Sequence, residues 1–431
     1  MTCYSTLERT FARYLDSMPR ARSLAKSCYQ RANYLIFRER AFCIAMHRDA
    51  RIVLPEESPG RPASDGPCFF GYYDKSPWSP DMRYVLAHAL QKDGTAAIRM
   101  YDLQMRRAHT LGFSVAWNYQ QGSMLQWLPG SPEPQVIWND VVDGNLGMRL
   151  VSIFSRSTRW IPWPIQTVHP NGREALTLNY RRLHRIRAEY GYPIQVRNFK
   201  PDQPLWCDGI WYIDLQTGEG RLTLSLEELS ALQPRRDMAD AQHKVNHLIY
   251  SPRGNRVAFM HRWIGRQGKL SRLYVADNHG RAPRLLLDTG MVSHYAWLND
   301  DHLLAWARTD QQGDRYYLID VSSGSWVIIG QGVLDAFGDG HPSYSPDLRW
   351  IVTDTYPDRG RQRHLLLYSA VNHRFLEVGR FLAPWHYDGA LRCDLHPRWS
   401  PDGNWISIDS VHTGRRALFL IDVSRLIADS R

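Results

Sequence analysis

Histidine recurs at one position of a sequence repeat, three residues before an aromatic residue that opens a turn. The four copies lie in the second half of the chain, at His247, His294, His341 and His396. Side chains at equivalent positions of neighbouring repeats lie next to one another when the repeats pack in a ring. Four imidazoles along one arc could bind a metal ion or move a proton near neutral pH.

Cys393 lies three residues before His396 and adds a sulfur ligand to this arc. Mixed Cys and His ligands favour zinc among the common metals. Because residues three apart on a regular strand face opposite sides of the sheet, the site requires a turn or bulge around Asp394. The alternative is a channel whose polar side chains bond only to water and backbone. We predict a structural divalent metal ion, best fitted by zinc, on His294, His341, Cys393 and His396.

A long insertion at about residues 179–205 interrupts the third repeat and is rich in tyrosine and arginine. Insertions over one face of a repeat structure commonly form the wall of a binding groove. Arginine binds carboxylates and sulfates through paired hydrogen bonds, and tyrosine can exchange a proton. The insertion therefore predicts an acidic-glycan site with Arg181, Tyr190 and Tyr192 as binding residues. A solvated basic loop is the alternative.

Amide side chains lie at the predicted strand ends of the second repeat, at Asn118, Gln121 and Asn139. Amides at blade edges could hydrogen-bond sugar hydroxyls, so these three complete the predicted substrate-binding set. Hydrogen bonding within turns and at strand ends is the alternative.

Repeats of an aromatic residue followed by Ser-Pro-Asp, or by a related turn, predict the elements that would position these side chains. Clear copies begin at Trp78, Tyr250, Tyr344 and Trp399, and weaker copies begin at Trp127, His169 and Trp297. Two hairpins per unit make a four-stranded blade, and seven blades in a ring leave no free sheet edge. We predict an all-β, seven-bladed β-propeller over residues 68–431.

Residues 1–54 differ from the rest, because apolar residues at helical spacing alternate with arginines and predict a basic helical segment. Residues 1–51 hold ten Lys or Arg and four Asp or Glu, so they supply +6 of the formal net charge of +10. This segment could cap the propeller, or residues 1–50 could make peripheral contact with an anionic membrane. Residues 55–67 are rich in Pro, Gly and Ser and predict a linker.

The positive net charge favours acidic partners, but we predict no nucleic-acid partner because no recognisable reader module is present. Charged residues interrupt every apolar run, so we expect neither a signal peptide nor a transmembrane segment. The six cysteines form no disulfide framework, which fits the cytoplasm. The common motifs of phosphoryl transfer, hydride transfer and serine hydrolysis are missing, which argues against those reactions.

The segments NHLIYSP, HPSYSPD and DLHPRWSPDG resemble seven-bladed propeller lyases that cleave uronate polysaccharides. The resemblance is closer to ulvan lyases than to oligogalacturonate lyases and covers about residues 68–423; TolB-like propellers share the repeated turns. It implies that His341, Cys393 and His396 bind the metal ion. It also implies a third-blade tyrosine as base or acid and a later arginine that neutralises the substrate carboxylate, which match Tyr180 and Arg197. The second-blade histidines of these enzymes are replaced here by Gln120, Gln121 and Asn139.

The leading hypothesis is a polysaccharide lyase that cleaves a uronic-acid-containing glycan by β-elimination. This reaction removes the C5 proton beside the carboxylate, so the site must neutralise the carboxylate, accept the proton and protonate O4. Tyr180 could act as base near neutral pH only if nearby positive charge lowered its pKa, and His247 is a partner or alternative base. The rival hypothesis is a non-catalytic glycan-binding or assembly propeller associated with polysaccharide biosynthesis.

Overall fold

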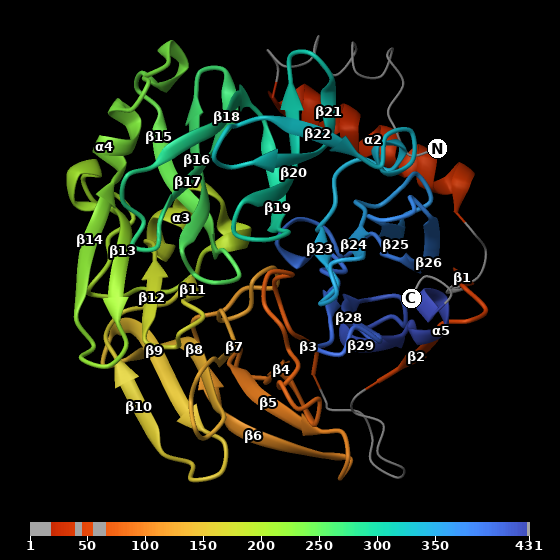
Figure 1. Ribbon diagram of the computed structural model, residues 1–431, viewed down its shortest axis with the longest axis horizontal. Coiled ribbons are helices and arrows are strands. Elements are labelled where there is room, and N and C mark those ends of the chain that lie inside the picture. Colours follow the sequence, from red (N-terminus) through yellow and green to blue (C-terminus); the bar gives the residue numbers. More distant parts are fainter. Residues whose placement is uncertain (1–18, 39–44, 55–65, 429–431) are drawn as a thin grey trace.

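The computed structural model describes residues 19–38, 45–54 and 66–428. Their strands form seven antiparallel sheets arranged in a ring (Figure 1), which confirms the predicted all-β, seven-bladed propeller. Within each sheet the strands follow sequence order, apart from two strands near the N-terminus.

Each of the first four blades contains four strands. Blade one is formed by β3 (Cys68–Phe69), β4 (Tyr84–Leu90), β5 (Ala96–Asp102) and β6 (Arg107–Ser114). Blade two is formed by β7 (Gln126–Leu128), β8 (Gln135–Val142), β9 (Asn145–Ser152) and β10 (Thr158–Ile161). Blade three is formed by β11 (Thr167–Val168), β12 (Glu174–Thr177), β13 (Gly209–Asp214) and β14 (Gly220–Ser225). Blade four is formed by β15 (Gln242–Tyr250), β16 (Arg256–Gly265), β17 (Gly268–Asp277) and β18 (Arg284–Gly290).

The last three blades complete the ring. Blade five is formed by β19 (Val292–Trp297), β20 (His302–Thr309), β21 (Gly313–Asp320) and β22 (Trp326–Ile329). Blade six contains β23 (Ser343–Tyr344), β24 (Trp350–Asp354), β25 (Gln362–Ser369) and β26 (Phe375–Leu382). Blade seven contains β27 (Arg398–Trp399), β28 (Trp405–Ser410) and β29 (Ala417–Asp422).

Two short strands near the N-terminus join the ends of the chain. β2 (Arg51–Val53) pairs with β29 as the fourth strand of blade seven, and β1 (Ala45–Met46) adds a fifth strand to blade six. Among its described residues, the predicted basic segment 1–54 is thus helical at Pro19–Phe37 and β-stranded at Ala45–Met46 and Arg51–Val53. The domain boundaries stay predictions, because residues 55–65 of the predicted linker lie outside the described residues.

The repeated turns are built as the sequence predicted. In the four clear copies the backbone N–H five residues after the serine donates to its hydroxyl, at 2.8 Å for Ser79, 2.9 Å for Ser345 and Ser400, and 3.2 Å for Ser251. The aromatic residue that opens a turn links blades, since Trp297 donates from Nε1 to the Ile249 carbonyl of blade four at 3.1 Å. Trp127 and Trp399 make the same kind of bond to their preceding blades. The turns are therefore scaffold.

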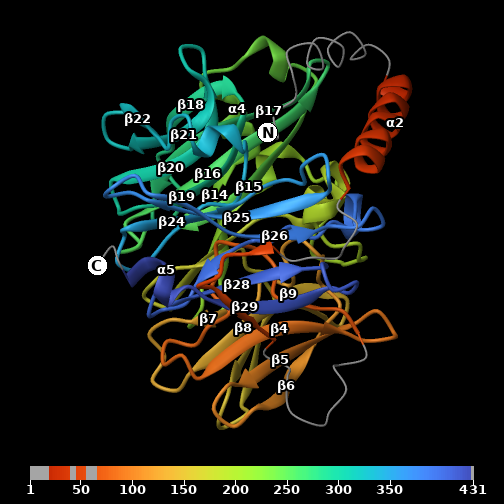
Figure 2. The same ribbon diagram turned by 90° about the vertical axis from the view of Figure 1, so that its right-hand side faces the viewer.

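Helices are few and lie outside the sheets (Figure 2). The α-helices are α2 (Pro19–Phe37), α3 (Tyr180–Ile186), α4 (Leu226–Ala231) and α5 (Ser424–Ala428). The short 3₁₀ helices are η2 (Ala188–Tyr190), η3 (Leu205–Cys207), η4 (Arg236–Met238), η5 (Leu334–Ala336) and η6 (Gly389–Leu391). In the described part of the chain no helix combines the length and apolarity needed to cross a membrane.

Because β2 completes blade seven and so closes the ring, a charge introduced into β2 should destabilise the fold. Ile52 is half-buried and packs against the core of blades six and seven. We expect Ile52→Asp to lower the free energy of unfolding by about 2 kcal/mol, because it removes apolar contact and buries part of a charge. Urea denaturation measures this difference, with the exposed neighbour substitution Arg51→Gln as control. Superimposable curves for Ile52→Asp and the wild type would contradict a closing role for β2.

Candidate functional site

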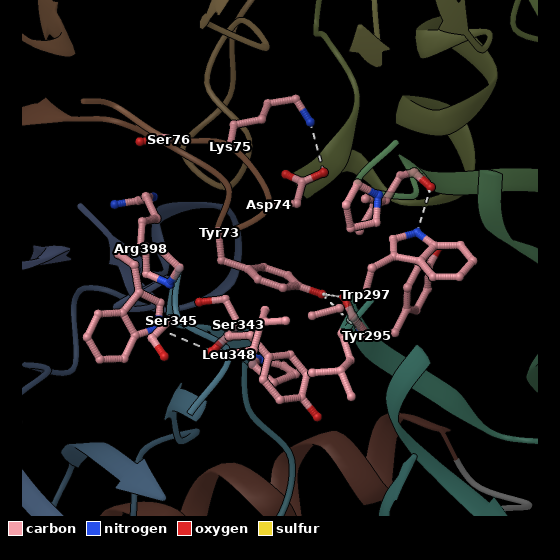
Figure 3. A pocket seen from close by; sticks show the side chains of 18 of the residues that line it. Tyr73, Asp74, Lys75, Ser76, Tyr295, Trp297, Ser343, Ser345, Leu348 and Arg398 are labelled. Atoms are coloured by element: carbon pink, nitrogen blue, oxygen red, sulfur yellow. Dashed lines mark hydrogen bonds and ion pairs between the residues drawn. The ribbon is translucent and has the colours of Figure 1, made fainter. Parts of the chain in front are cut away.

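The central channel has a pocket at each face of the ring. A turn-side pocket of about 440 Å³ lies at the Ser-Pro turns and includes Tyr73, Asp74 and Arg398 (Figure 3). An α2-side pocket of about 430 Å³ is lined by residues of α2 and by loops that follow β24 and β26. The two pockets lie at opposite ends of β24, because a Ser-Pro turn precedes this strand and the α2-side lining residue Tyr356 follows it.

Tyr72 and Tyr73 fill the channel at the level of the predicted histidine arc. Both tyrosines follow β3 and are buried. Their rings contact all four histidines, at centroid distances from 4.9 Å for Tyr72–His247 to 6.4 Å for Tyr73–His396. The structure therefore brings the four histidines together around this tyrosine pair.

A local break in strand geometry orients two of the histidines. His247 and His396 have φ angles of 57° and 46°, a backbone region that non-glycine residues rarely adopt. In β15 the pairing with β16 changes register between Asn246 and Ile249, on either side of His247. Such a bulge re-aims a side chain, and bulges are frequent next to functional sites.

Three side chains form a group that could hold a divalent metal ion. One ligand atom each from His341, Asp394 and His396 lies within 4.8 Å of the other two. Nε2 of His341 and Nε2 of His396 are buried and have no hydrogen-bond partner. Unpartnered imidazole nitrogens beside a carboxylate are a suitable donor set for a divalent ion. The residues present therefore fit such an ion.

Carboxylates outside this group fix the orientation of its histidines. Nδ1 of His341 lies 2.7 Å from Asp354, which also accepts the backbone N–H groups of His341 and His396 at 2.8 and 3.0 Å. With Nδ1 bonded to a carboxylate, Nε2 of His341 is left as the lone-pair donor, which is the usual arrangement around bound metals. His294 is oriented in the same way, with Nδ1 2.9 Å from Asp339.

Burial keeps the imidazoles of His396 and His247 neutral. Desolvation lowers the pKa of His396 well below its ordinary value, and His341 lowers it further. The pKa of His247 is also well below its ordinary value, through burial and then through His294. Neutral rings offer lone pairs to a metal ion or a proton.

Asp394 is a ligand candidate that reasoning from the sequence missed, although it stands between Cys393 and His396. Its carboxylate lies 2.7 Å from Arg363 and 2.7 Å from Arg392. Burial alone would raise the pKa of Asp394, but these two guanidinium groups hold it well below its ordinary value. Asp394 is therefore ionised, and it links the histidines to the arginines of the α2-side pocket.

Cys393 does not join this group. Its side chain packs in a small apolar cluster with Ala383 and Val411. Burial raises the pKa of the Cys393 thiol to about 11, so the thiolate that binds metals is not the form present at neutral pH. His294 is adjacent to His341, with ring centroids 4.1 Å apart, but lies outside the three-residue group.

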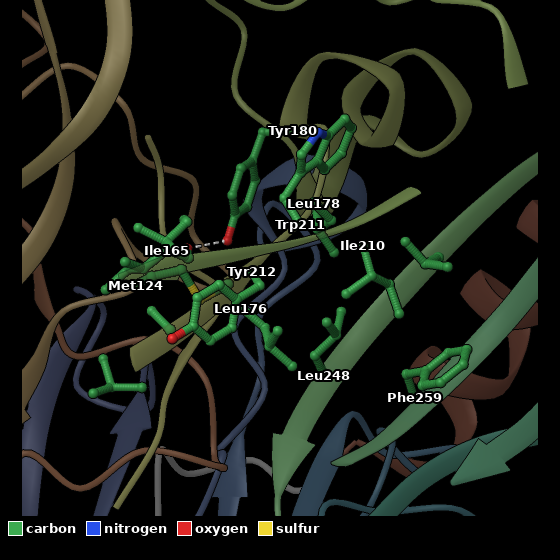
Figure 4. Close-up of a cluster of buried hydrophobic side chains, with 14 of the residues drawn as sticks. Met124, Ile165, Leu176, Leu178, Tyr180, Ile210, Trp211, Tyr212, Leu248 and Phe259 are labelled. Carbon is green, nitrogen blue, oxygen red and sulfur yellow. Dashed lines mark hydrogen bonds between the residues drawn. The ribbon is translucent and has the colours of Figure 1, made fainter. Parts of the chain in front are cut away.

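Tyr180 lies in the hydrophobic core beside the channel (Figure 4). Its hydroxyl donates to the Ile165 carbonyl at 2.6 Å, and its ring stacks on Tyr192 at 4.4 Å. Desolvation raises the pKa of Tyr180 well above its ordinary value, the direction opposite to that required of a base. Asn139 bonds to the Tyr192 hydroxyl and to Ile165, so its amide serves this same buried network.

The remaining predicted binding residues are dispersed. Arg197 is exposed and lies against the Gly144 turn of blade two, while Arg181 bonds to Gln195 within the insertion. Asn118 accepts two backbone N–H groups in a turn. Gln121 is buried with no hydrogen-bond partner at either amide atom.

Tyr190 is the predicted residue of the insertion that contacts Arg392, an ion-pair partner of Asp394. Its hydroxyl accepts a hydrogen bond from Arg392 at 3.4 Å, and the Arg187 guanidinium lies 4.3 Å from its ring centre. Its ring also contacts Tyr72 at 6.1 Å. Tyr190 therefore connects the insertion with blade seven and with the tyrosine pair in the channel.

Solved oligogalacturonate lyases share this fold. The enzyme from Vibrio parahaemolyticus matches with a TM-score of 0.59 and 13% identity, over 87% of this chain and 97% of that one. An oligogalacturonate lyase in complex with manganese matches with a TM-score of 0.61 and 16% identity, over 88% of this chain and 96% of that one. TolB from Acinetobacter baumannii matches less closely, with a TM-score of 0.36 and 13% identity, over 74% of this chain and 65% of that one. The sequence matches no family model and no curated protein. At these identities the likeness establishes the propeller fold alone.

The geometry predicts which substitutions disturb metal binding. We expect His396→Ala to weaken binding of a divalent ion by about 10-fold or more, because it removes one of three convergent ligands. Cys393→Ser is the matched control and should leave affinity unchanged. Calorimetric titration with manganese and with zinc, after chelator treatment, measures both variants. If Cys393→Ser lost affinity for the metal ion while His396→Ala kept it, Cys393 would be a ligand and His396 would not.

Proposed function

We propose that this protein is a polysaccharide lyase that cleaves a uronic-acid-containing glycan by β-elimination at the α2-side pocket. The observation that supports it most is the position of the His341, Asp394 and His396 group beneath a pocket lined by Arg359, Arg361, Arg363 and Arg392. Asp394 joins the two features, because it pairs with both Arg363 and Arg392. A cationic pocket next to a metal-binding group suits an acidic sugar.

The charge of the α2-side pocket favours a carboxylate. Four arginines face it, and the acidic residues of its lining are Asp358 and Asp388. Arg363 is almost fully buried, and its Nε and Nη2 have no hydrogen-bond partner. Trp385 and Tyr356 also line the pocket, and aromatic rings of this kind pack against sugar faces.

Elimination requires a group that takes the C5 proton and a group that protonates O4. In this proposal Tyr190 moves a proton, because it is the tyrosine of the insertion that contacts Arg392 at the pocket. Tyr180 is less suited, since burial raises its pKa and its hydroxyl is engaged by the Ile165 carbonyl. A divalent ion on His341, Asp394 and His396 would supply a Lewis acid near the substrate carboxylate. We keep zinc as one candidate for that ion beside manganese.

A panel of uronate polysaccharides tests the activity directly. We expect the purified protein to release products with the ultraviolet absorbance of a C4–C5 double bond. Tyr190→Phe should lower kcat about 100-fold or more while KM changes little, because proton transfer is lost and binding is kept.

Tyr180→Phe separates the two tyrosine assignments. If the larger loss of kcat falls on Tyr180→Phe, the proton carrier is the core tyrosine and the role given to Tyr190 is wrong.

A non-catalytic glycan-binding or assembly propeller is the second candidate. It is favoured by the burial of Tyr180, Tyr190 and His247, which leaves these candidate proton carriers without access to solvent. Binding of an acidic glycan without release of an unsaturated product from any substrate of the panel would select this candidate over the lyase.

We also propose a cytoplasmic location with peripheral membrane contact through α2. The four described cysteines, Cys28, Cys68, Cys207 and Cys393, are free, which suits a reducing compartment. The last turn of α2 exposes Leu35 and Ile36 by 63% and 72%, next to the exposed Arg31 and Arg38. Apolar side chains flanked by arginines suit an anionic lipid surface.

Vesicle sedimentation tests this contact. The protein should bind vesicles containing phosphatidylserine more strongly than neutral vesicles, and Leu35→Asp/Ile36→Asp should abolish the difference. Val371→Asp, at an equally exposed apolar side chain of blade six, is the control. Equal binding of the double variant and the wild type would rule out α2 as the contact.

A further inference from the structure

Two cations lie opposite each other inside blade four. Lys244 of β15 and Arg262 of β16 are direct cross-strand partners. Side chains at such positions stand on the same face of the sheet, with Cβ atoms about 5 Å apart. Lys244 is 1% exposed and Arg262 is 7% exposed, so both charges are removed from water.

Neither cation is neutralised by the protein. Nζ of Lys244 and Nε of Arg262 have no hydrogen-bond partner. Nη2 of Arg262 donates to the Met260 sulfur at 3.1 Å, to the Val292 carbonyl at 3.2 Å and to the Ser293 carbonyl at 3.5 Å, all of which are uncharged. In the described part of the chain neither residue forms an ion pair with a carboxylate, unlike Arg363 and Arg392, which share Asp394.

Further positive charge surrounds this pair. Burial, followed by Arg262 and Arg187, lowers the pKa of Lys244 well below its ordinary value. Desolvation, followed by Arg187 and Arg262, lowers the pKa of Lys269 to about 8. Arg392 acts on Lys269 in the same direction, and Glu189 is the acidic residue that opposes these effects. The cations of blade four, of the insertion and of blade seven therefore lie close enough to repel one another.

This group of cations adjoins the proposed active site. Arg187 stacks on Tyr190, which bonds to Arg392. The Arg262 guanidinium bonds to the Val292 and Ser293 carbonyls, directly before His294 of the histidine arc. The cation pair thus lies between the insertion and the histidines.

Buried like charges that face each other destabilise a fold, and an uncompensated buried charge costs more than a paired one. Such an arrangement is typical of a binding site whose ligand supplies the missing charge. One oxyanion with two acceptor oxygens could accept hydrogen bonds from Nζ of Lys244 and Nε of Arg262 together. We propose that Lys244 and Arg262 form an oxyanion site that binds the carboxylate of an acidic sugar. The sugar part of this inference rests on the proposed function, and it adds a second position for a sugar carboxylate to the one proposed at the α2-side pocket.

Proton uptake is a direct consequence of this site. A bound anion raises the pKa of Lys244 and of Lys269 back toward the ordinary lysine value, so binding takes protons from solvent. Because the pKa of free Lys269 is about 8, anion affinity should fall as the pH rises through that value. The other charged groups around the site are Arg187, Arg262, Arg392 and Glu189. Calorimetry in buffers of different ionisation enthalpy measures the number of protons taken up.

The deciding experiment compares Lys244→Met with Lys92→Met, which changes an exposed lysine of blade one. The probes are an oligogalacturonate, its carboxyl-reduced neutral counterpart and inorganic sulfate. Without ligand, Lys244→Met should have a Tm equal to or above the wild type, because a buried amine without a hydrogen-bond partner is replaced by an apolar side chain of similar length. It should bind the oligogalacturonate about 10- to 100-fold more weakly, as expected for loss of a hydrogen bond between charged groups. Lys92→Met should match the wild type in both measurements.

Each outcome bears on the proposal separately from the lyase assignment. Carboxylate-dependent binding that is lost in Lys244→Met supports the oxyanion site even when no unsaturated product forms, and then only the lyase assignment fails. Equal affinity of the wild type and Lys244→Met for the oligogalacturonate overturns the proposal. Binding of sulfate but not of the oligogalacturonate also overturns it, since the site would then accept a free anion and not the carboxylate of a sugar.

Discussion

The carboxylate of Asp354 is the interaction on which the centre of this propeller depends. It accepts the ring and the backbone N–H of His341 from blade six and the backbone N–H of His396 from blade seven. Because one carboxylate satisfies donors of two neighbouring blades, the strained backbone at His396 is held in place and the two Nε2 atoms remain without protein partners. The orientation of the metal-binding group is thus set by a residue that is not part of it.

The fold could be predicted because its repeating unit is local. In the turns at Ser79, Ser345 and Ser400 the bond that shapes the backbone joins residues five apart, so the sequence pattern and the structure have the same cause. Ring closure, in contrast, does not follow from a local sequence pattern. β2 has three residues, and its partner β29 lies near the other end of the chain, so no local pattern distinguishes β2 from the rest of a basic helical segment. Its strand conformation is imposed by the free edge of blade seven.

Only the part of the candidate site that follows the sequence repeat could be predicted from the sequence. Register identified the four histidines, and the structure brings their rings together around Tyr72 and Tyr73. Register could not decide between Cys393 and Asp394, because both lie before β27 and outside any strand, where side chains need not alternate between two faces. Tyr180 illustrates a second limit, since the direction of its pKa shift follows from complete burial beside Tyr192, which the abundance of arginine in the insertion does not reveal.

Burial has opposite consequences for the two kinds of basic side chain in this molecule. Desolvation favours the neutral form, so it makes His247 and His396 better ligands or proton acceptors without leaving a charge uncompensated. For Lys244 and Arg262 the same desolvation is unfavourable, because an arginine keeps its charge and a lysine must lose a proton to avoid the cost. Arg363 and Arg392 avoid much of that cost through Asp394. Among the described residues no carboxylate forms an ion pair with Lys244 or Arg262, so an anion from outside would offset for this pair the cost that Asp394 offsets for Arg363 and Arg392.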